Sequence, residues 1–416
     1  MASVTLIGRA GAERTPPIRW SRGTLWAALF GAVLFSALFP FATFYFVLLL
    51  VAFTSGIHSP RREIVSLLCV GAIAVLGPLL ALKLPLDNGG NDKIQYLDFM
   101  RTMGASGILN YLIAQPELLS FSSLYVAWAL FGPTDLAFLF IFALFFSLML
   151  FAVWRIEYRA IPIFVVLLTS SAAFYSSYGN VIRQSMAFPF LLLLISSQQG
   201  KLRFVFFILA GFAHIPSLLI TAPYLAYRMF GKWVVWVSGL IAAAILFISA
   251  RNMQAFSAFS GDDGYLSKKI NLYSTWDAYS IATVAAMATG IFLINNLIWR
   301  RMRRKAVLSS ISSVDRVLEG LLVASNFAFM GLFATYNLAK VFERIYIYFF
   351  VISLVYLSIV IARRRSGPTK TLVILGALAY SVYGLLKNLE IQDLLFSGHP
   401  IGYLTASFLD LYRSFL

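Results

Sequence analysis

A short polar segment at residues 179–184, reading Gly-Asn-Val-Ile-Arg-Gln, stands between two apolar runs. Asn180, Arg183 and Gln184 have the spacing of side chains that share one face of a helix. An arginine beside a helix N-terminus is unfavourable with the helix dipole, so an anion that both could bind is a natural companion. The segment therefore predicts an anion-binding site. The alternative is an interfacial arginine that reaches to the lipid headgroups.

A histidine interrupts the apolar run 203–228, where Pro216 follows His214 closely and breaks the helix. An imidazole changes its protonation state near neutral pH, and an ionisable side chain in an apolar segment is costly. His214 is therefore a candidate catalytic group. The alternative is a buried histidine that bonds to a backbone carbonyl.

The least hydrophobic stretch of the chain, residues 84–118, holds a candidate carboxylate. Asp92 and Tyr96 are one helical turn apart, the spacing of a shared polar face. Asp98 and Arg101 are expected to pair with each other. The alternative for the whole stretch is a solvated loop.

A second arginine precedes the apolar run 345–361. Arg344 lies one helical turn from Lys340 and shares a face with Tyr348. Lysine and arginine gather on the cytoplasmic side of membrane proteins, so two cations at the opposite end of a span need an explanation. We expect Arg344 to bind an anion. For Lys340, a surface pair with Glu343 that contributes little is the simpler interpretation.

The amino-acid composition indicates whether water or lipid surrounds the chain. Of 416 residues, 60% are hydrophobic and 12% are charged, and the mean hydropathy is +0.83. A soluble chain of this size carries about twice that charged fraction and could not bury so much apolar surface. Disorder requires low hydrophobicity. Both classes are excluded, and long apolar runs without alternation predict an all-α polytopic membrane protein.

The net charge of +16 comes from short basic clusters between the apolar runs. These clusters lie at residues 61–62, 201–203, 300–305 and 363–370. Their placement is typical of cytoplasmic loops under the positive-inside rule, so nucleic acid is not an expected partner. The lone Cys69 cannot form an intramolecular disulfide, and no Cys/His cluster predicts a metal site.

Span lengths predict about 12–14 membrane helices in a single integral membrane domain, residues 1–416. Several of these are expected to be broken or re-entrant, notably 118–131 as a partial segment and 203–228 as two half-depth helices that turn near His214. The predicted topology places the tail 1–22 in the cytoplasm and makes 84–118 and 250–276 periplasmic loops.

The remaining expected segments follow the hydropathy. They are a hairpin over 24–39 and 41–55, then spans at 64–83, 134–154, 160–179, 183–198, 233–249, 277–299, 315–336, 345–361 and 371–387, and a tail 390–416 that is either an amphipathic segment or a last short span.

The polar groups together predict an outward-facing cavity with arginines, a histidine and a carboxylate. Such a set suits a lipid-linked diphosphate and a sugar acceptor better than an ion path. The run Gly-Asn-Val-Ile-Arg-Gln-Ser-Met-Ala at 179–187 and the run Ala-Gly-Phe-Ala-His-Ile-Pro-Ser at 210–217 resemble the EpsG-type branch of the Wzy polysaccharide polymerases. Asp92 with Tyr96, and Phe342-Glu343-Arg344 with Tyr348, also resemble that family. The likeness extends over about residues 84–350, and it departs from the family pattern where Pro216 stands before Ser217.

The resemblance implies a metal-independent glycosyltransferase of the bacterial inner membrane with a GT-C-like helical fold and no cofactor. Such a polymerase transfers a growing glycan from undecaprenyl diphosphate to a lipid-linked repeat unit of O-antigen or exopolysaccharide at the periplasmic face. Its partners would be the two lipid-linked glycans, membrane lipid and a chain-length regulator.

The resemblance also suggests roles for the candidate residues. Arg183 and Arg344 would bind the diphosphate, since a guanidinium offers a planar fork of donors where negative charge develops. His214 is the preferred general base and Asp92 the second candidate. Four residues would bind sugar or orient the arginines, namely Asn180, Gln184, Tyr96 and Tyr348.

Two other classes of protein remain open at this point. An O-antigen ligase or another GT-C glycosyltransferase would use similar groups for a different transfer. A flippase or exporter of lipid-linked oligosaccharide would move its cargo without chemistry, and it should need a cationic path through the whole membrane. The candidate cations gather at the outer rim, which favours the enzyme.

Overall fold

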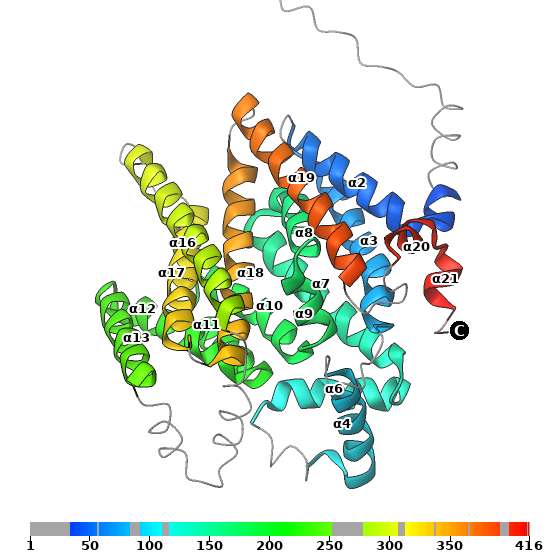
Figure 1. Ribbon diagram of the computed structural model, residues 1–416, viewed down its shortest axis with the longest axis horizontal. Coiled ribbons are helices and arrows are strands. Elements are labelled where there is room, and N and C mark those ends of the chain that lie inside the picture. Colours follow the sequence, from blue (N-terminus) through cyan, green and yellow to red (C-terminus); the bar gives the residue numbers. More distant parts are fainter. Residues whose placement is uncertain are drawn as a thin grey trace, which may run out of the picture.

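The computed structural model describes residues 34–55, 58–83, 92–109, 116–251, 278–306, 313–336, 338–364, 367–391, 399–413 and 415. These residues form helices joined by turns and loops, with no strand among them (Figure 1). The prediction of an all-α polytopic membrane protein is confirmed.

The described helices follow one another in chain order. Their bounds are α2 Pro40–Thr54, α3 Arg62–Ala81, α4 Lys93–Ser106, α6 Leu118–Phe131, α7 Asp135–Glu157, η1 Tyr158–Ala160, α8 Ile161–Thr169, α9 Ala172–Gly179, α10 Ile182–Ser196, α11 Gly200–Ala213, η2 Ile215–Ser217, α12 Leu218–Phe230, α13 Trp233–Arg251, α16 Ala278–Ala306, α17 Ser313–Ala334, α18 Ala339–Arg363, α19 Pro368–Ile391, α20 Pro400–Thr405 and α21 Phe408–Tyr412.

The described residues supply fewer full crossings than the 12–14 membrane helices expected. Six helices are long and apolar enough to cross a membrane, or up to seven if the bent pair of α9 and α10 counts as one span. The others are shorter, such as α2 and α6, because the hydropathy of a run does not reveal where its helix breaks. Residues 24–33 of the expected hairpin and 252–277 of the expected loop lie outside the described residues.

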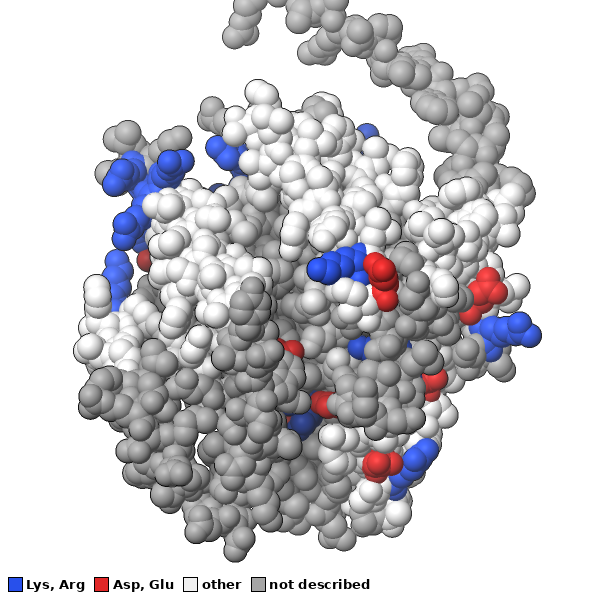
Figure 2. All heavy atoms as spheres, viewed as in Figure 1, with Lys and Arg blue, Asp and Glu red and all other residues white. Residues whose placement is uncertain are grey.

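Two ion pairs define one end of the bundle. Arg363 at the end of α18 bonds to Asp315 at 2.6 Å, and Arg303 near the end of α16 bonds to Glu319 at 2.8 Å. Figure 2 shows basic side chains gathered at the upper left, where α16 ends in Figure 1. The ends of α16 and α18 and the start of α17 therefore form a basic end.

Polar contacts join the same three helices inside the membrane-crossing region. Asn295 of α16 donates to the Ser353 hydroxyl of α18 at 3.1 Å, and Ser353 lies 3.0 Å from the Ser325 hydroxyl of α17. Asn296 and Asn326 pair at 3.1 Å. Side-chain hydrogen bonds of this kind help to hold helices together where lipid supplies no hydrophobic driving force. They fix α18, which carries two candidate residues.

The run 203–228 forms a helical hairpin, as expected. Helix α11 ends at Ala213, η2 makes the turn, and α12 runs back, so that the charges of Arg203 and Arg228 interact. The 14 residues of α11 extend roughly 21 Å at 1.5 Å per residue, less than the about 30 Å of a bilayer core. His214 therefore lies at the tip of a hairpin that enters from the basic end.

Helix α6 has 14 residues, which is consistent with the partial segment expected at 118–131. It packs against α4, the helix found within the expected loop 84–118 (Figure 1). Lys93 at the start of α4 bonds to Asp135 of α7 at 2.7 Å. These contacts place α4 and α6 over the end of the bundle opposite the basic end.

The expected span 160–179 is broken in the structure. Helix α8 ends at Thr169, and the Ser171 side chain caps the start of α9. Helices α9 and α10 then meet at 108°. At the C-terminus, α20 and α21 have 6 and 5 residues, so the described part of the tail does not form a last span.

The packing of α4 on α6 gives a stability prediction. A Cβ at Gly104 would overlap with the indole of Trp128, whereas a Cβ at Gly290 would have open space. Overpacking costs about 1–3 kcal/mol, so Gly104→Ala should lower the melting temperature of the purified protein in detergent. Gly290→Ala is the matched control and should not lower it. Equal melting of Gly104→Ala and wild type would contradict the close packing of α4 on α6.

Candidate functional site

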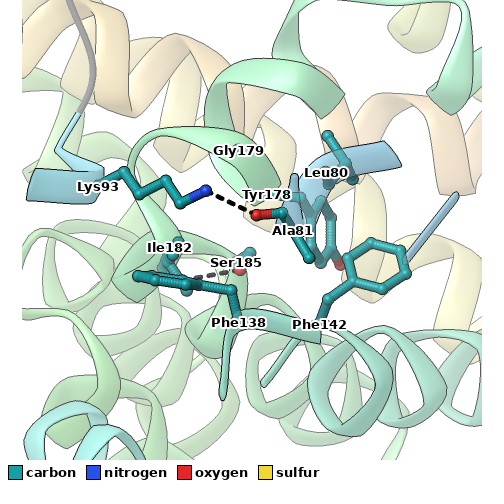
Figure 3. A pocket seen from close by; sticks show the side chains of 9 residues that line it. All are labelled: Leu80, Ala81, Lys93, Phe138, Phe142, Tyr178, Gly179, Ile182 and Ser185. Carbon is teal, nitrogen blue, oxygen red and sulfur yellow. Dashed lines mark hydrogen bonds between the residues drawn. The ribbon is translucent and has the colours of Figure 1, made fainter. Parts of the chain in front are cut away.

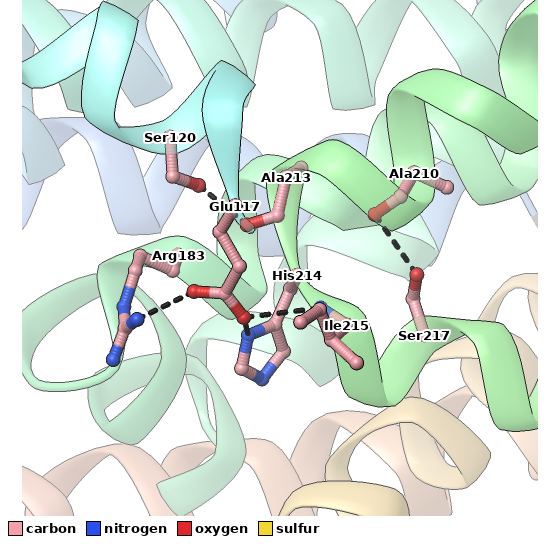
Figure 4. A network of polar contacts seen from close by, with 8 residues as sticks. All are labelled: Glu117, Ser120, Arg183, Ala210, Ala213, His214, Ile215 and Ser217. Atoms are coloured by element: carbon pink, nitrogen blue, oxygen red, sulfur yellow. Dashed lines mark hydrogen bonds and ion pairs between the residues drawn. The ribbon is translucent and has the colours of Figure 1, made fainter. Parts of the chain in front are cut away.

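Three ionisable side chains meet at the end of the bundle opposite the basic end (Figure 4). One Glu117 oxygen bonds to Arg183 at 2.5 Å, and the other lies 2.8 Å from Nδ1 of His214. The same second oxygen accepts the backbone N–H of Ile215 at 3.0 Å. The side chains of Glu117 and His214 are only 7% and 1% exposed, so the network is buried.

The carboxylate of Glu117 determines the tautomer of His214. Burial alone would raise the pKa of Glu117, but the hydrogen bond from His214, the charge of Arg183 and the bond from Ile215 outweigh it and hold the pKa below its usual range. An ionised carboxylate only accepts hydrogen bonds, so Nδ1 of His214 must carry the proton. The lone pair of the neutral ring then lies on Nε2, the atom that a general base needs.

Local structure brings these groups together. Glu117 is the residue before α6, and the Ser120 hydroxyl in the first turn of α6 donates to the carbonyl of Ala213 at the end of α11. At the hairpin tip, the Ser217 hydroxyl donates to the carbonyl of Ala210 at 2.9 Å. The start of α6 is therefore tied to the break that carries His214.

Helix α18 brings the second arginine to the same place. Gln184 of α10 donates to the backbone carbonyl of Arg344 at 2.6 Å. The ring of Tyr348 stacks with His214 at 6.4 Å between centroids and 25° between planes. The charge of Arg344 interacts with both His214 and Tyr348. The charges of two arginines far apart in the sequence thus act on one imidazole.

Helix α4 covers the arginine from another side. Tyr96 is buried, and the charges of Arg183, Asp92 and Arg344 all interact with its hydroxyl. Asp92 also interacts with Arg183. The guanidinium of Arg183 lies 5.6 Å from the ring centroid of Phe121 in α6. The two candidate bases, Asp92 and His214, therefore both lie within the electrostatic reach of Arg183.

Several polar atoms of this cluster are buried and have no hydrogen-bond partner among the described residues. They are the hydroxyls of Tyr96 and Tyr348, Nε of Arg183, Oε1 of Gln184 and Nε2 of His214. Buried polar groups without partners are costly and rare, so each needs an explanation. Donors and acceptors gathered around two arginines are the features of a site that binds a polar, anionic ligand.

The spacing predicts that Asn180 shares a helix face with Arg183 and Gln184. This prediction is wrong, because the chain bends between Asn180 and α10. Asn180 stands in the bend before α10, and its side chain accepts a hydrogen bond from Lys83 at 2.5 Å. Lys93 nearby donates to the carbonyl of Ala81 at 2.8 Å, across a small pocket that Gly179 also lines (Figure 3). The contact of Asn180 therefore joins α3 to the bend.

Sequence reasoning missed Glu117, the residue at the centre of the network. It is one of the charged residues of the polar stretch 84–118, and no spacing within that stretch singles it out. A signal was present, because Glu117 directly precedes the apolar run 118–131 and lipid makes such a position costly for a carboxylate. Asp98 and Arg101 do form the expected exposed pair, at 3.4 Å. Asp262 and the side chain of Lys340 lie outside the described residues.

The fold and the buried polar centre define a polytopic helical membrane protein with a site near one end of its bundle. The sequence profile of the EpsG family matches residues 68–397, and the chain belongs to this polysaccharide polymerase-type family. No curated protein and no solved structure matches the chain. Family membership indicates a polymerase-like glycosyltransferase in polysaccharide biosynthesis.

Proposed function

We propose that the protein transfers a growing glycan from undecaprenyl diphosphate to a lipid-linked repeat unit, in the synthesis of an O-antigen or exopolysaccharide. The observation that carries the proposal is that the Glu117 carboxylate bonds both to Nδ1 of the buried His214 and to Arg183, while the charge of Arg344 acts on the same imidazole. The transfer requires a base for the acceptor hydroxyl and positive charge for the departing diphosphate, and these residues supply both.

The proposed step balances within the two substrates. The acceptor hydroxyl loses its proton to Nε2 of His214, and its oxygen bonds to the anomeric carbon of the donor glycan. The bond between that carbon and the diphosphate oxygen breaks, and undecaprenyl diphosphate leaves with the negative charge. Donors placed where this charge develops lower the barrier, which is the role assigned to Arg183 and Arg344.

The two arginines would contribute differently. Glu117 already bonds one nitrogen of Arg183, but Nε of Arg183 has no partner among the described residues. Arg344 is half-buried at the start of α18. The hydroxyls of Tyr96 and Tyr348 and the amide oxygen of Gln184 would contact sugar or orient the arginines.

His214 suits the base role better than Asp92. Its ring is oriented by Glu117, and its Nε2 is a buried acceptor with no hydrogen-bond partner among the described residues. Asp92 is half-buried at the start of α4 and interacts with Arg183, and a carboxylate is intrinsically the weaker base at neutral pH. Asp92 stays the second candidate.

The distribution of charges supports a proposed orientation in the bacterial inner membrane. The basic end, with Arg303 and Arg363, would face the cytoplasm, and the site would face the periplasm. Residues 84–118, 250–276 and 337–344 would then be periplasmic, and 299–313 and 362–370 cytoplasmic. Reporter fusions at Asp262 should be active on the periplasmic side, and a cytoplasmic reading would contradict the topology.

A flippase is the alternative from another class, and it would need cations along the whole membrane depth. Among the described residues, the cations of the site, Arg183 and Arg344, lie at one end, while Arg303 and Arg363 pair with acids at the other. This distribution favours chemistry at a fixed site. The proposal includes no metal or cofactor, and a chain-length regulator is a proposed partner.

A deletion strain that makes O-antigen tests the function. Loss of a polymerase should leave lipopolysaccharide with the core and one repeat unit, and a gel should show that single band in place of the ladder. Loss of a ligase or a flippase should remove even the single repeat. If the deletion strain lacks even the one-repeat band, and complementation with the gene restores the ladder, the polymerase assignment is contradicted.

A further inference from the structure

We propose that Glu117 is the positioning residue of this site, because its carboxylate holds the His214 ring with Nδ1 protonated and Nε2 turned toward the acceptor while it also clamps Arg183. The inference rests on the proposed function for the identity of the reaction. The geometry itself stands on the contacts of Glu117 alone.

The hydrogen bonds of Glu117 leave little freedom to the carboxylate. One oxygen bonds to Arg183, and the other accepts from Nδ1 of His214 and from the backbone of Ile215. The Ile215 bond attaches the carboxylate to the backbone of the hairpin tip, directly beside the histidine. The ring and its partner are therefore fixed to the same turn, and rotation of His214 would break the contact.

The two oxygens of Glu117 also link the proposed base, His214, to the proposed phosphate-binding cation, Arg183. The base and the phosphate-binding cation are held by one side chain, so their separation is set by a carboxylate rather than by two independent helices. A bonded carboxylate stabilises the imidazolium that forms when Nε2 takes a proton, and it does so without becoming protonated itself. Arg344 and Arg183 oppose that positive charge, and Tyr348 stacks on the ring, so Glu117 is the group among these that favours it.

The tautomer can be measured without activity. The chain has 3 histidines, so ring ¹⁵N labelling gives few signals, and His58→Gln with His399→Gln leaves that of His214. In the full-length protein in lipid at neutral pH, we expect His214 to carry its proton on Nδ1. In Glu117→Gln, the amide can bond to either tautomer, and we expect a mixture. A wild-type ring protonated on Nε2, or uniformly charged, would overturn the proposal.

Kinetics provide the second readout. Glu117→Gln should lower kcat at least about tenfold, a part of the about 10² to 10⁴ that proton transfer to a positioned base contributes. Its effect on KM for the lipid-linked donor should be smaller than its effect on kcat, since Arg183 keeps its charge. Loss of the negative charge destabilises the imidazolium, so the acid limb of the pH profile should move to lower pH. Glu117→Asp, which keeps the charge, should recover part of kcat and the wild-type limb.

Glu157→Gln is the matched control. Glu157 is buried and bonds to Arg159 at 2.7 Å, and it ends α7, whose opposite end bonds to Lys93 through Asp135. It should leave kcat and the pH profile unchanged. If Glu117→Gln instead raises KM and leaves the acid limb in place, Glu117 only supports the fold and the proposal fails. If wild-type protein polymerises nothing while His214 still carries its proton on Nδ1, the proposed function fails and the positioning by Glu117 stands.

Discussion

Replacement of His214 by glutamine is expected to slow polymerisation at least about tenfold, because general base catalysis contributes about 10² to 10⁴. Glutamine can still bond to Glu117 through its amide, so the hairpin tip should keep its shape. It offers no nitrogen lone pair that takes a proton at neutral pH. We therefore expect His214→Gln to be well expressed, to bind the donor and to turn over slowly with purified lipid-linked repeat units.

The parallel variant Asp92→Asn separates the two candidate bases. Asp92 interacts with Arg183 and Tyr96 but has no contact with the His214 ring in the described structure. Asp92→Asn should therefore reduce the rate of polymerisation less than His214→Gln does. Near-normal polymer from His214→Gln together with an inactive Asp92→Asn would transfer the base role to Asp92 and leave His214 as a packing residue.

Lysine in place of Arg183 or Arg344 is expected to reduce the rate of polymerisation by about 10² to 10³, the usual effect of removing one donor from a developing oxyanion. Lysine keeps the charge but loses the planar fork that matches phosphate oxygens. At position 183 it can also still pair with Glu117, so that the buried carboxylate is not left alone. The rates should be measured with expression and donor binding monitored.

Arg303→Lys is the control for this pair of variants. Arg303 has an exposed side chain that bonds to Glu319 at the basic end of the bundle, and its replacement should leave polymerisation unchanged. Alanine at 183 or 344 tests the charge as well as the fork. Wild-type rates from both Arg183→Ala and Arg344→Ala would refute the anion site.

Much of the membrane architecture could be predicted from hydropathy and charge. The basic residues Arg203 and Arg228 at both ends of one apolar run predicted a hairpin, and the structure has it, with His214 at the tip. The reason is general, since charges are costly in lipid and mark the ends of segments. The break at Ser170 and Ser171 was missed, because two serines change the mean hydropathy of a run very little.

The candidate site was predicted in its parts but not in its connections. Spacing along one helix grouped Asn180 with Arg183, but the chain bends between them and Asn180 turns to Lys83 instead. Glu117 is 66 and 97 residues from Arg183 and His214, and a single sequence carries no information on such tertiary contacts. Helical periodicity can predict neighbours one turn apart, whereas the fold alone brings α6, α10 and α11 to one point.

The most direct test of the central claim is polymerisation by the purified full-length protein in lipid vesicles, with a lipid-linked repeat unit as the sole substrate. We expect a ladder of lipid-linked products that differ by one repeat, together with release of undecaprenyl diphosphate. His214→Gln in the same vesicles should give at most short products. Wild-type protein that forms no ladder, but carries the lipid-linked unit across the bilayer, would contradict the claim and identify a transporter.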